Sequence, residues 1–117
     1  MEALVRVDQV YLRRYPKTPR LARSGIVYGR TEVWDSVPDL LARRYGDCKS
    51  LTAMHVAEER QAGKNAQPVF RLAINPESGR KEFHILSEVE GKYIDMSRLL
   101  GMEQYHQQRG LWMFPNG

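Results

Sequence analysis

The chain has 117 residues and a mass of 13.6 kDa, which suits one domain and is too small for two separate hydrophobic cores. Hydrophobic residues make up 42% and charged residues 27%, a composition that excludes wholesale disorder. No run approaches the roughly 18 apolar residues of a membrane span, and residues 1–6 lack the regions of a signal peptide. We therefore expect a single domain, residues 1–117, in the cytoplasm and without membrane contact.

The net charge is +4, and much of the basic excess lies in the first third of the chain. Such a surface could meet nucleic acid or an acidic protein. The basic residues are scattered, however, and the sequence carries no zinc finger or RNA-binding aromatic motif. A solvated basic face is therefore favoured, and nucleic acid is not expected as a partner.

The first 35 residues divide into a helix and an extended segment. Apolar residues recur at helical spacing between residues 3 and 15, at Leu4, Val7, Tyr11 and Leu12. Pro16 stops this pattern. Residues 16–35 contain two prolines and two glycines, which predicts an irregular segment that wraps a core and holds one short strand near residues 26–28.

Two helices are expected between residues 36 and 63. Ser36 can cap a short helix with Pro38 in its first turn, and Gly46 ends it. Asp47 can cap a second helix from Cys48 to Gln61, with a glycine at position 63 just beyond its end. Cys48 therefore falls in the first turn of the second helix.

The remaining chain alternates between apolar and polar residues. Residues 66–74 and 82–89 read as strands joined by a turn at 75–79, and a short connection leads into a third strand at 93–95. Strands joined this closely form an antiparallel meander. The fold class is therefore α+β, with helices packed on a small antiparallel sheet.

The tail from residue 98 to 117 follows a core at about 36–97. It predicts a short helical piece at 98–100, a polar stretch, and the apolar cluster Leu111-Trp112-Met113-Phe114. This cluster could dock on the domain itself or on a partner subunit, and docking on the domain is favoured.

Cys48 is the chain's one cysteine, in the run Tyr45-Gly46-Asp47-Cys48. It cannot form an internal disulfide, and no second thiol or histidine stands at ligand spacing, so no metal or cofactor is expected. A lone cysteine is often a buried structural thiol. A helix N-terminus, however, favours the reactive thiolate through its unpaired amide groups and dipole.

His84 and Asp95 could supply the partners of a cysteine nucleophile. They lie on adjacent predicted strands, and pairing centred on residues 90 and 91 brings them within about two residues of each other. An imidazole can accept the thiol proton, and a carboxylate behind it fixes the ring orientation.

His55 is the competing base. It lies seven residues after Cys48, about 10 Å further along the same helix, which is too far for direct proton transfer. We expect it to be packed beneath the sheet or bonded to a backbone carbonyl. His106, in the polar tail, is expected on the surface.

The motif Gly-Asp-Cys at a helix start, followed by a histidine on one strand and an aspartate on the next, resembles the transglutaminase-like core of the papain-type superfamily. The resemblance runs from about residue 45 to 97 and implies that Cys48 is the nucleophile, His84 the general base and acid, and Asp95 the orienting residue. Many members carry aromatic residues after the cysteine and the histidine, where this chain has Lys49-Ser50 and Ile85-Leu86. An oxyanion hole could use the Cys48 amide with Trp34 or Tyr45.

The whole chain, through its Tyr45-Gly46-Asp47-Cys48 start and the run from Asp95 to Met102, also resembles small transglutaminase-like proteins of tailed bacteriophages and prophages. This implies a location in the bacterial host cytoplasm or in the virion. Two functions stay open: acyl transfer on a protein or peptide substrate, with hydrolysis as the simpler outcome, or a structural role among other phage proteins.

Overall fold

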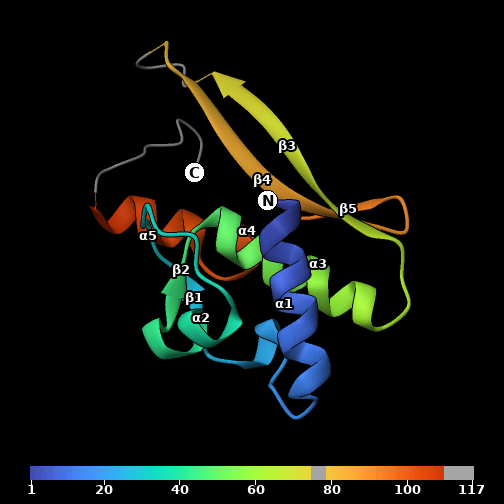
Figure 1. The fold of residues 1–117 in the computed structure, drawn as a ribbon. Helices are drawn as coiled ribbons and strands as arrows, with labels where there is room; N and C mark the ends of the chain where they lie inside the picture. The colour runs from blue at the N-terminus through green and yellow to red at the C-terminus, as the bar shows by residue number, and fades with distance from the viewer. Residues whose placement is uncertain (75–78, 110–117) are drawn as a thin grey trace.

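The computed structural model describes residues 1–74 and 79–109 and has the expected α+β architecture (Figure 1). Residues 75–78 of the turn predicted at 75–79 and the apolar cluster at 111–114 lie outside the described residues. The order of helices and strands is α1 (Glu2–Arg14), η1 (Leu21–Arg23), β1 (Val27–Tyr28), α2 (Val37–Arg43), β2 (Tyr45–Gly46), α3 (Cys48–Gln61), β3 (Ala66–Ile74), β4 (Lys81–Val89), β5 (Lys92–Ile94), α4 (Met96–Leu99) and α5 (Met102–Arg109).

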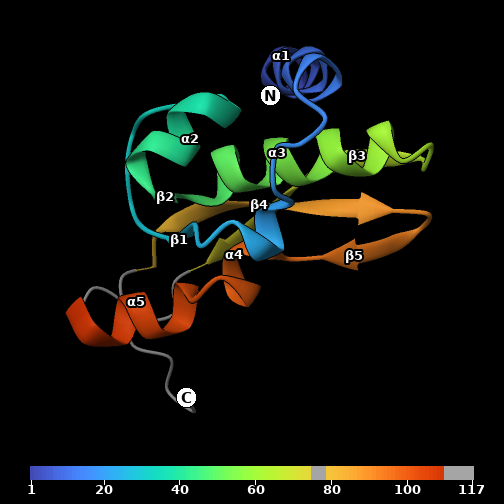
Figure 2. The ribbon, with the colours of Figure 1, turned by 90° about the horizontal axis from the view of Figure 1, so that it is seen from below.

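Helix α3 is the centre of the molecule. It lies between α1 and the sheet (Figure 2), and it packs against both. Every residue from Ser50 to Glu59 is buried, so the helix has no solvent face along most of its length. A helix covered all round is a core element, and its first turn is therefore held in a fixed position.

Helix α1 covers α3 through a stripe that differs from the one expected. The buried residues are Val5, Asp8 and Leu12. Val7, which was expected on this stripe, is 53% exposed. One member of the inward stripe is thus an aspartate. Its Oδ1 accepts a hydrogen bond of 2.9 Å from the backbone amide of Val37, which ties α1 to the start of α2.

The main sheet has the order β3-β4-β5 and is antiparallel throughout. Val89 pairs with Lys92, so β4 and β5 are joined by the two residues Glu90 and Gly91. Both have positive φ, 51° and 78°, which is the requirement of a type I′ turn. The β3-β4 hairpin projects well beyond the helices (Figure 1).

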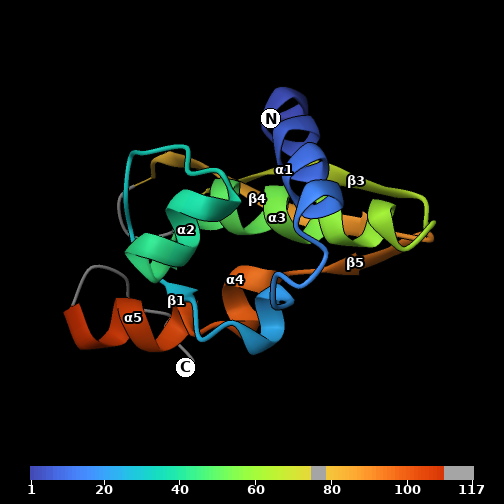
Figure 3. The same ribbon diagram turned by 60° about the horizontal axis from the view of Figure 1, so that its bottom comes forward.

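Two features of the fold were not predicted. Strands β1 and β2 form a parallel pair, where only β1 was expected from the sequence. The polar stretch after α4 contains helix α5. Figure 3 shows β1, α4 and α5 grouped on the side of α3 opposite to α1, so these short elements complete the surroundings of the N-terminal end of α3. In the part of the chain that the structure describes, no helix is both long and apolar enough to span a bilayer.

Candidate functional site

Cys48 is the first residue of α3. The preceding Asp47 caps the helix, since its Oδ1 accepts a hydrogen bond of 3.3 Å from the amide of Lys49. Its other oxygen forms an ion pair with the Lys49 ammonium. The thiol is free and half-buried. The cysteine thus has the helix-start position that the sequence predicted, where unpaired amides and the helix dipole favour an anion.

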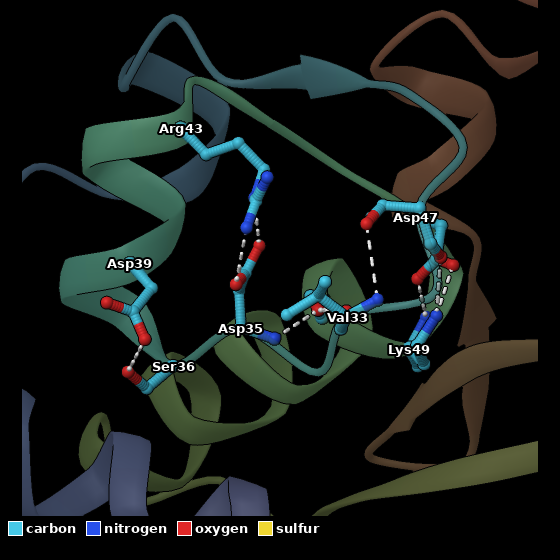
Figure 4. Close-up of polar contacts among 9 residues, drawn as sticks. Val33, Asp35, Ser36, Asp39, Arg43, Asp47 and Lys49 are labelled. Carbon is cyan, nitrogen blue, oxygen red and sulfur yellow. Dashed lines mark hydrogen bonds and ion pairs between the residues drawn. The ribbon is translucent and has the colours of Figure 1, made fainter.

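The segment before α2 is bonded to the first turn of α3 (Figure 4). The Asp35 amide donates to Ser50 Oγ at 2.9 Å, and that hydroxyl donates to the carbonyl of Val33 at 3.4 Å. The Asp35 carboxylate in turn accepts 2.7 and 3.5 Å bonds from Arg43, and Lys49 Nζ donates to Thr31 O at 2.8 Å. These bonds hold the wrapping segment beside the cysteine.

The approach of β2 to α3 depends on glycine at position 46. The Gly29 amide donates to the Gly46 carbonyl at 2.9 Å, which fixes β2 against the end of β1. A Cβ atom on Gly46 would lie 2.5 Å from Cδ2 of buried Leu40. The residue two positions before Cys48 is therefore small because α2 packs directly on it.

His84 and Asp95 are in direct contact. His84 Nε2 lies 2.7 Å from Asp95 Oδ2, and the two side chains are 25% and 21% exposed. The last ladder pair of β4 and β5 joins Ser87 to Ile94, so continuing the register sets Asp95 two residues from His84 on the same face of the hairpin. This is the separation that the hairpin spacing predicted.

The imidazole also interacts with Cys48. Hydrogen bonds with Asp95 and then with the Cys48 thiol raise the pKa of His84 to about 9, against the opposing effect of burial. Burial pushes the pKa of Asp95 upward, but the hydrogen bond and charge of His84 outweigh it and lower that pKa. Asp95 contacts the ring through Nε2. The three side chains that the sequence grouped are thus brought together.

His55 lies elsewhere. Its Nδ1 is 2.8 Å from Ser87 Oγ and its Nε2 is 3.5 Å from Glu59. The ring is buried beneath the sheet as expected, although its partners are side chains and not a carbonyl. Burial lowers the pKa of His55, which favours its neutral form. The side chain of His106 lies outside the described residues.

The two aromatic residues considered for an oxyanion hole have other partners. Trp34 is 51% exposed, and its ring lies 5.8 Å from Lys49 Nζ. The Tyr45 ring lies 5.7 Å from the guanidinium of Arg43. These contacts do not test the oxyanion-hole assignment, which stays a prediction.

Tyr28 is a neighbour of Cys48 that the sequence did not single out. It is 9% exposed, and it pairs with Gly46 in the β1-β2 ladder. Burial raises the pKa of its phenol, and the charges of Cys48 and Asp47 raise it further. The short apolar run at residues 26–28 predicted a strand there. It could not predict the pairing of this strand with β2, because the paired residues are 18 positions apart in the sequence.

The described residues hold no group of three or more His, Cys, Asp or Glu side chains that could bind a metal ion. No family model matches the sequence, and a comparison with curated proteins finds no match. Among solved structures, the fold is similar to a protein from Cytophaga hutchinsonii described as a "putative cysteine protease". The two share 16% identity with a TM-score of 0.47, over 85% of this chain and 39% of that chain. This chain therefore spans well under half the length of that protein.

Proposed function

We propose that the protein is a transglutaminase-like cysteine acyl-transfer enzyme, with Cys48 as nucleophile, His84 as general base and acid, and Asp95 as the orienting residue. The observation that carries the proposal is the position of one imidazole beside both other groups. His84 Nε2 lies 2.7 Å from Asp95 Oδ2, and the ring is close enough to Cys48 for that side chain to raise the pKa of His84.

The arrangement suits a protonated His84 at neutral pH. Because the pKa of His84 is raised to about 9, its cationic form predominates at pH 7, and the ring therefore holds the proton that a leaving group needs. The anionic Asp95 would keep the ring in place while its charge changes, which is the role of the third residue in a catalytic triad.

The reaction proceeds in two steps that follow from these roles. The Cys48 sulfur attacks an amide or ester carbonyl carbon, and the carbonyl electron pair moves to oxygen. His84 donates its proton to the leaving amine or alcohol as the C–N or C–O bond breaks, which leaves a thioester on Cys48. Water, or an amine in a transfer reaction, then gives a proton to His84 and attacks the thioester carbonyl carbon. The C–S bond breaks, which releases the acid or the new amide and returns the sulfur and the protonated His84 to their starting state.

Hydrolysis is the simpler overall reaction. The chain shows no feature in its sequence that would select an amine as acceptor over water. A protein or peptide is the proposed substrate class, and the bacterial host cytoplasm is the proposed location.

Alkylation and acylation of Cys48 test this proposal without a known substrate. Iodoacetamide should alkylate Cys48 at pH 6.5 at least about tenfold faster than it alkylates a free cysteine peptide, and p-nitrophenyl acetate should leave an acetyl thioester on Cys48 detectable by mass spectrometry. Cys48→Ala is the matched control for both reactions. A Cys48 that reacts no faster than the free peptide and forms no thioester contradicts the proposal.

A second candidate is a structural role in a phage particle, with other phage proteins as partners. The observation that favours it is an exposed apolar face on the projecting β3-β4 hairpin. Its members are 53–74% exposed and share one face of the ladder: Phe70, Leu72, Ile74 and Phe83. Apolar patches of this kind mark protein contacts.

The two candidates give opposite results in a particle. Stoichiometric presence of the protein in purified virions, together with full infectivity of the Cys48→Ala variant, supports the structural role. Absence from virions with loss of infectivity in the same variant supports catalysis.

A further inference from the structure

A groove of about 540 Å³ opens beside β1, between Tyr45 and the link from α4 to α5. Three tyrosines and two other polar side chains line it, together with glycine and aliphatic residues. The residues that the following argument uses are Tyr28, Arg30, Tyr45, Gln104 and Tyr105.

One wall of the groove continues into the helix that carries Cys48. Tyr28 pairs with Gly46, and the cysteine follows two residues later. Two extended residues span at most about 7 Å, so the strand that borders the groove ends next to the thiol. The influence of the Cys48 charge on the Tyr28 phenol agrees with this short separation.

The other wall of the groove contains Leu100, which follows the helix capped by Asp95. Asp95 caps α4, and α4 leads directly to Leu100. The carbonyl of Leu100 accepts a 2.9 Å hydrogen bond from the amide of Tyr28. The groove is therefore bounded by the segments that position two of the three candidate site residues.

The groove offers aromatic surface and a positive charge. The Tyr28 and Tyr105 rings meet edge to face with centroids 5.3 Å apart, and Tyr45 is 38% exposed. Arg30 is exposed at the rim, and its charge reaches the Tyr28 phenol. The nearby carboxylate, Asp47, is paired with Lys49, so the charge that faces the groove is positive.

We infer that this groove binds the part of an acidic peptide that adjoins the carbonyl attacked by Cys48, with Arg30 pairing with a carboxylate and the tyrosine rings contacting the peptide chain. The inference rests on the proposed acyl transfer and names its substrate class. The chain's net charge of +4 would further favour an acidic partner through long-range attraction.

The test compares two esters with the same leaving group, the p-nitrophenyl esters of N-acetyl-Glu-Gly and N-acetyl-Lys-Gly. The unaltered protein should show a higher kcat/KM for the glutamyl ester, and 0.5 M NaCl should reduce the preference because salt screens exposed charges. Arg30→Glu should reverse the preference, with a change of about tenfold in the ratio of the two kcat/KM values. Arg14→Glu makes the same charge change on exposed α1, outside the groove, and should change the ratio by less than about twofold.

A second pair of variants tests the groove's volume. Gln104 lines the groove and Gln107 does not, and both are exposed on α5, so neither substitution disturbs the core. Gln104→Trp should raise KM for the glutamyl ester several-fold and leave iodoacetamide alkylation of Cys48 unchanged. Gln107→Trp should leave both quantities unchanged.

The outcomes separate this inference from the proposed function. If Cys48 reacts rapidly with iodoacetamide and cleaves both esters, but neither Arg30→Glu nor Gln104→Trp differs from its control, the groove is not the substrate site. If Cys48 is unreactive toward iodoacetamide and both esters, the acyl-transfer proposal itself is wrong, and the inference about its substrate falls with it.

Discussion

Asp95 holds His84 and at the same time caps a helix. Its Oδ2 lies 2.7 Å from His84 Nε2, while Oδ1 accepts a 3.3 Å hydrogen bond from the amide of Arg98 in α4. The cap fixes the carboxylate on the backbone, so the imidazole is oriented by a group that cannot rotate freely. His84 on the hairpin and the N-terminal cap of α4 thus belong to one site.

Asp95→Asn should lower the pKa of His84 from about 9 toward its usual value of 6.5. The hydrogen bond with Asp95 is the largest cause of the raised pKa, and an amide cannot stabilise the imidazolium as a carboxylate does. The asparagine still offers an oxygen for the cap, but the imidazolium loses the carboxylate that stabilises it, so the free energy of unfolding at pH 7 should fall by about 1–3 kcal/mol. NMR titration of the His84 ring measures the pKa. Asp39→Asn, at an exposed carboxylate on α2, is the control, and an unchanged titration in Asp95→Asn would show that the carboxylate does not set this pKa.

His84→Gln should slow the alkylation of Cys48, and His55→Gln should not. The first removes the proposed base, so alkylation by iodoacetamide at pH 6.5 should slow at least about tenfold. The second should leave that rate within about twofold but lower the free energy of unfolding by about 1–3 kcal/mol, because it disrupts a buried hydrogen bond to Ser87. Paired alkylation and urea-denaturation measurements decide the matter. Slow alkylation in His55→Gln, with normal alkylation in His84→Gln, would make His55 the base.

Asp8→Asn should stabilise the protein at pH 8 and have little effect at pH 4. Burial raises the pKa of Asp8 from 3.8 to about 7, and the charge of Glu58 adds to this increase. The folded state therefore holds the proton more tightly than the unfolded state, so the contribution to the free energy of unfolding is greatest below pH 4 and is lost as pH rises through 7.

An asparagine at position 8 keeps an oxygen for the Val37 amide and carries no charge. The gain at pH 8 should be about 1–3 kcal/mol, measured by urea denaturation at both pH values. Glu32→Gln, at an exposed position, should change stability at neither pH. Equal stability of Asp8→Asn and the unaltered protein at pH 8 would refute the argument.

Gly46→Ala should lower the free energy of unfolding by about 1–3 kcal/mol, the usual cost of forcing an extra carbon into a packed core. The added Cβ would lie 2.5 Å from Leu40 Cδ2, and the backbone at Gly46 does not have positive φ, so the cost is purely steric. Gly79→Ala is the complementary control: its φ is +67° with nothing within 4 Å, and it should cost only about 1–2 kcal/mol through the left-handed conformation. Thermal and urea denaturation of both variants measure the difference. A neutral Gly46→Ala would mean that α2 moves aside freely.

The local sequence predicted those parts of the site that depend on neighbours along the chain. Helix α3 and strand β3 have the predicted bounds, and Asp47 is the predicted cap. The proximity of His84 and Asp95 also followed from the sequence, because a two-residue turn fixes the register of the strands that it joins. Helix α5 was missed because only Met102 and Tyr105 give it an apolar side, too few residues to show an amphipathic period.

The sequence by itself thus determined the α+β class, the cysteine at a helix start, and the pairing of His84 with Asp95. Tertiary structure alone decided that the hairpin lies against the start of α3, so that His84 lies beside Cys48. It also decided that Tyr28 joins β2 and borders a groove beside the thiol. Such contacts link residues distant in the chain, and they arise from burial of apolar surface around α3, which is non-directional and leaves no short-range pattern in the sequence.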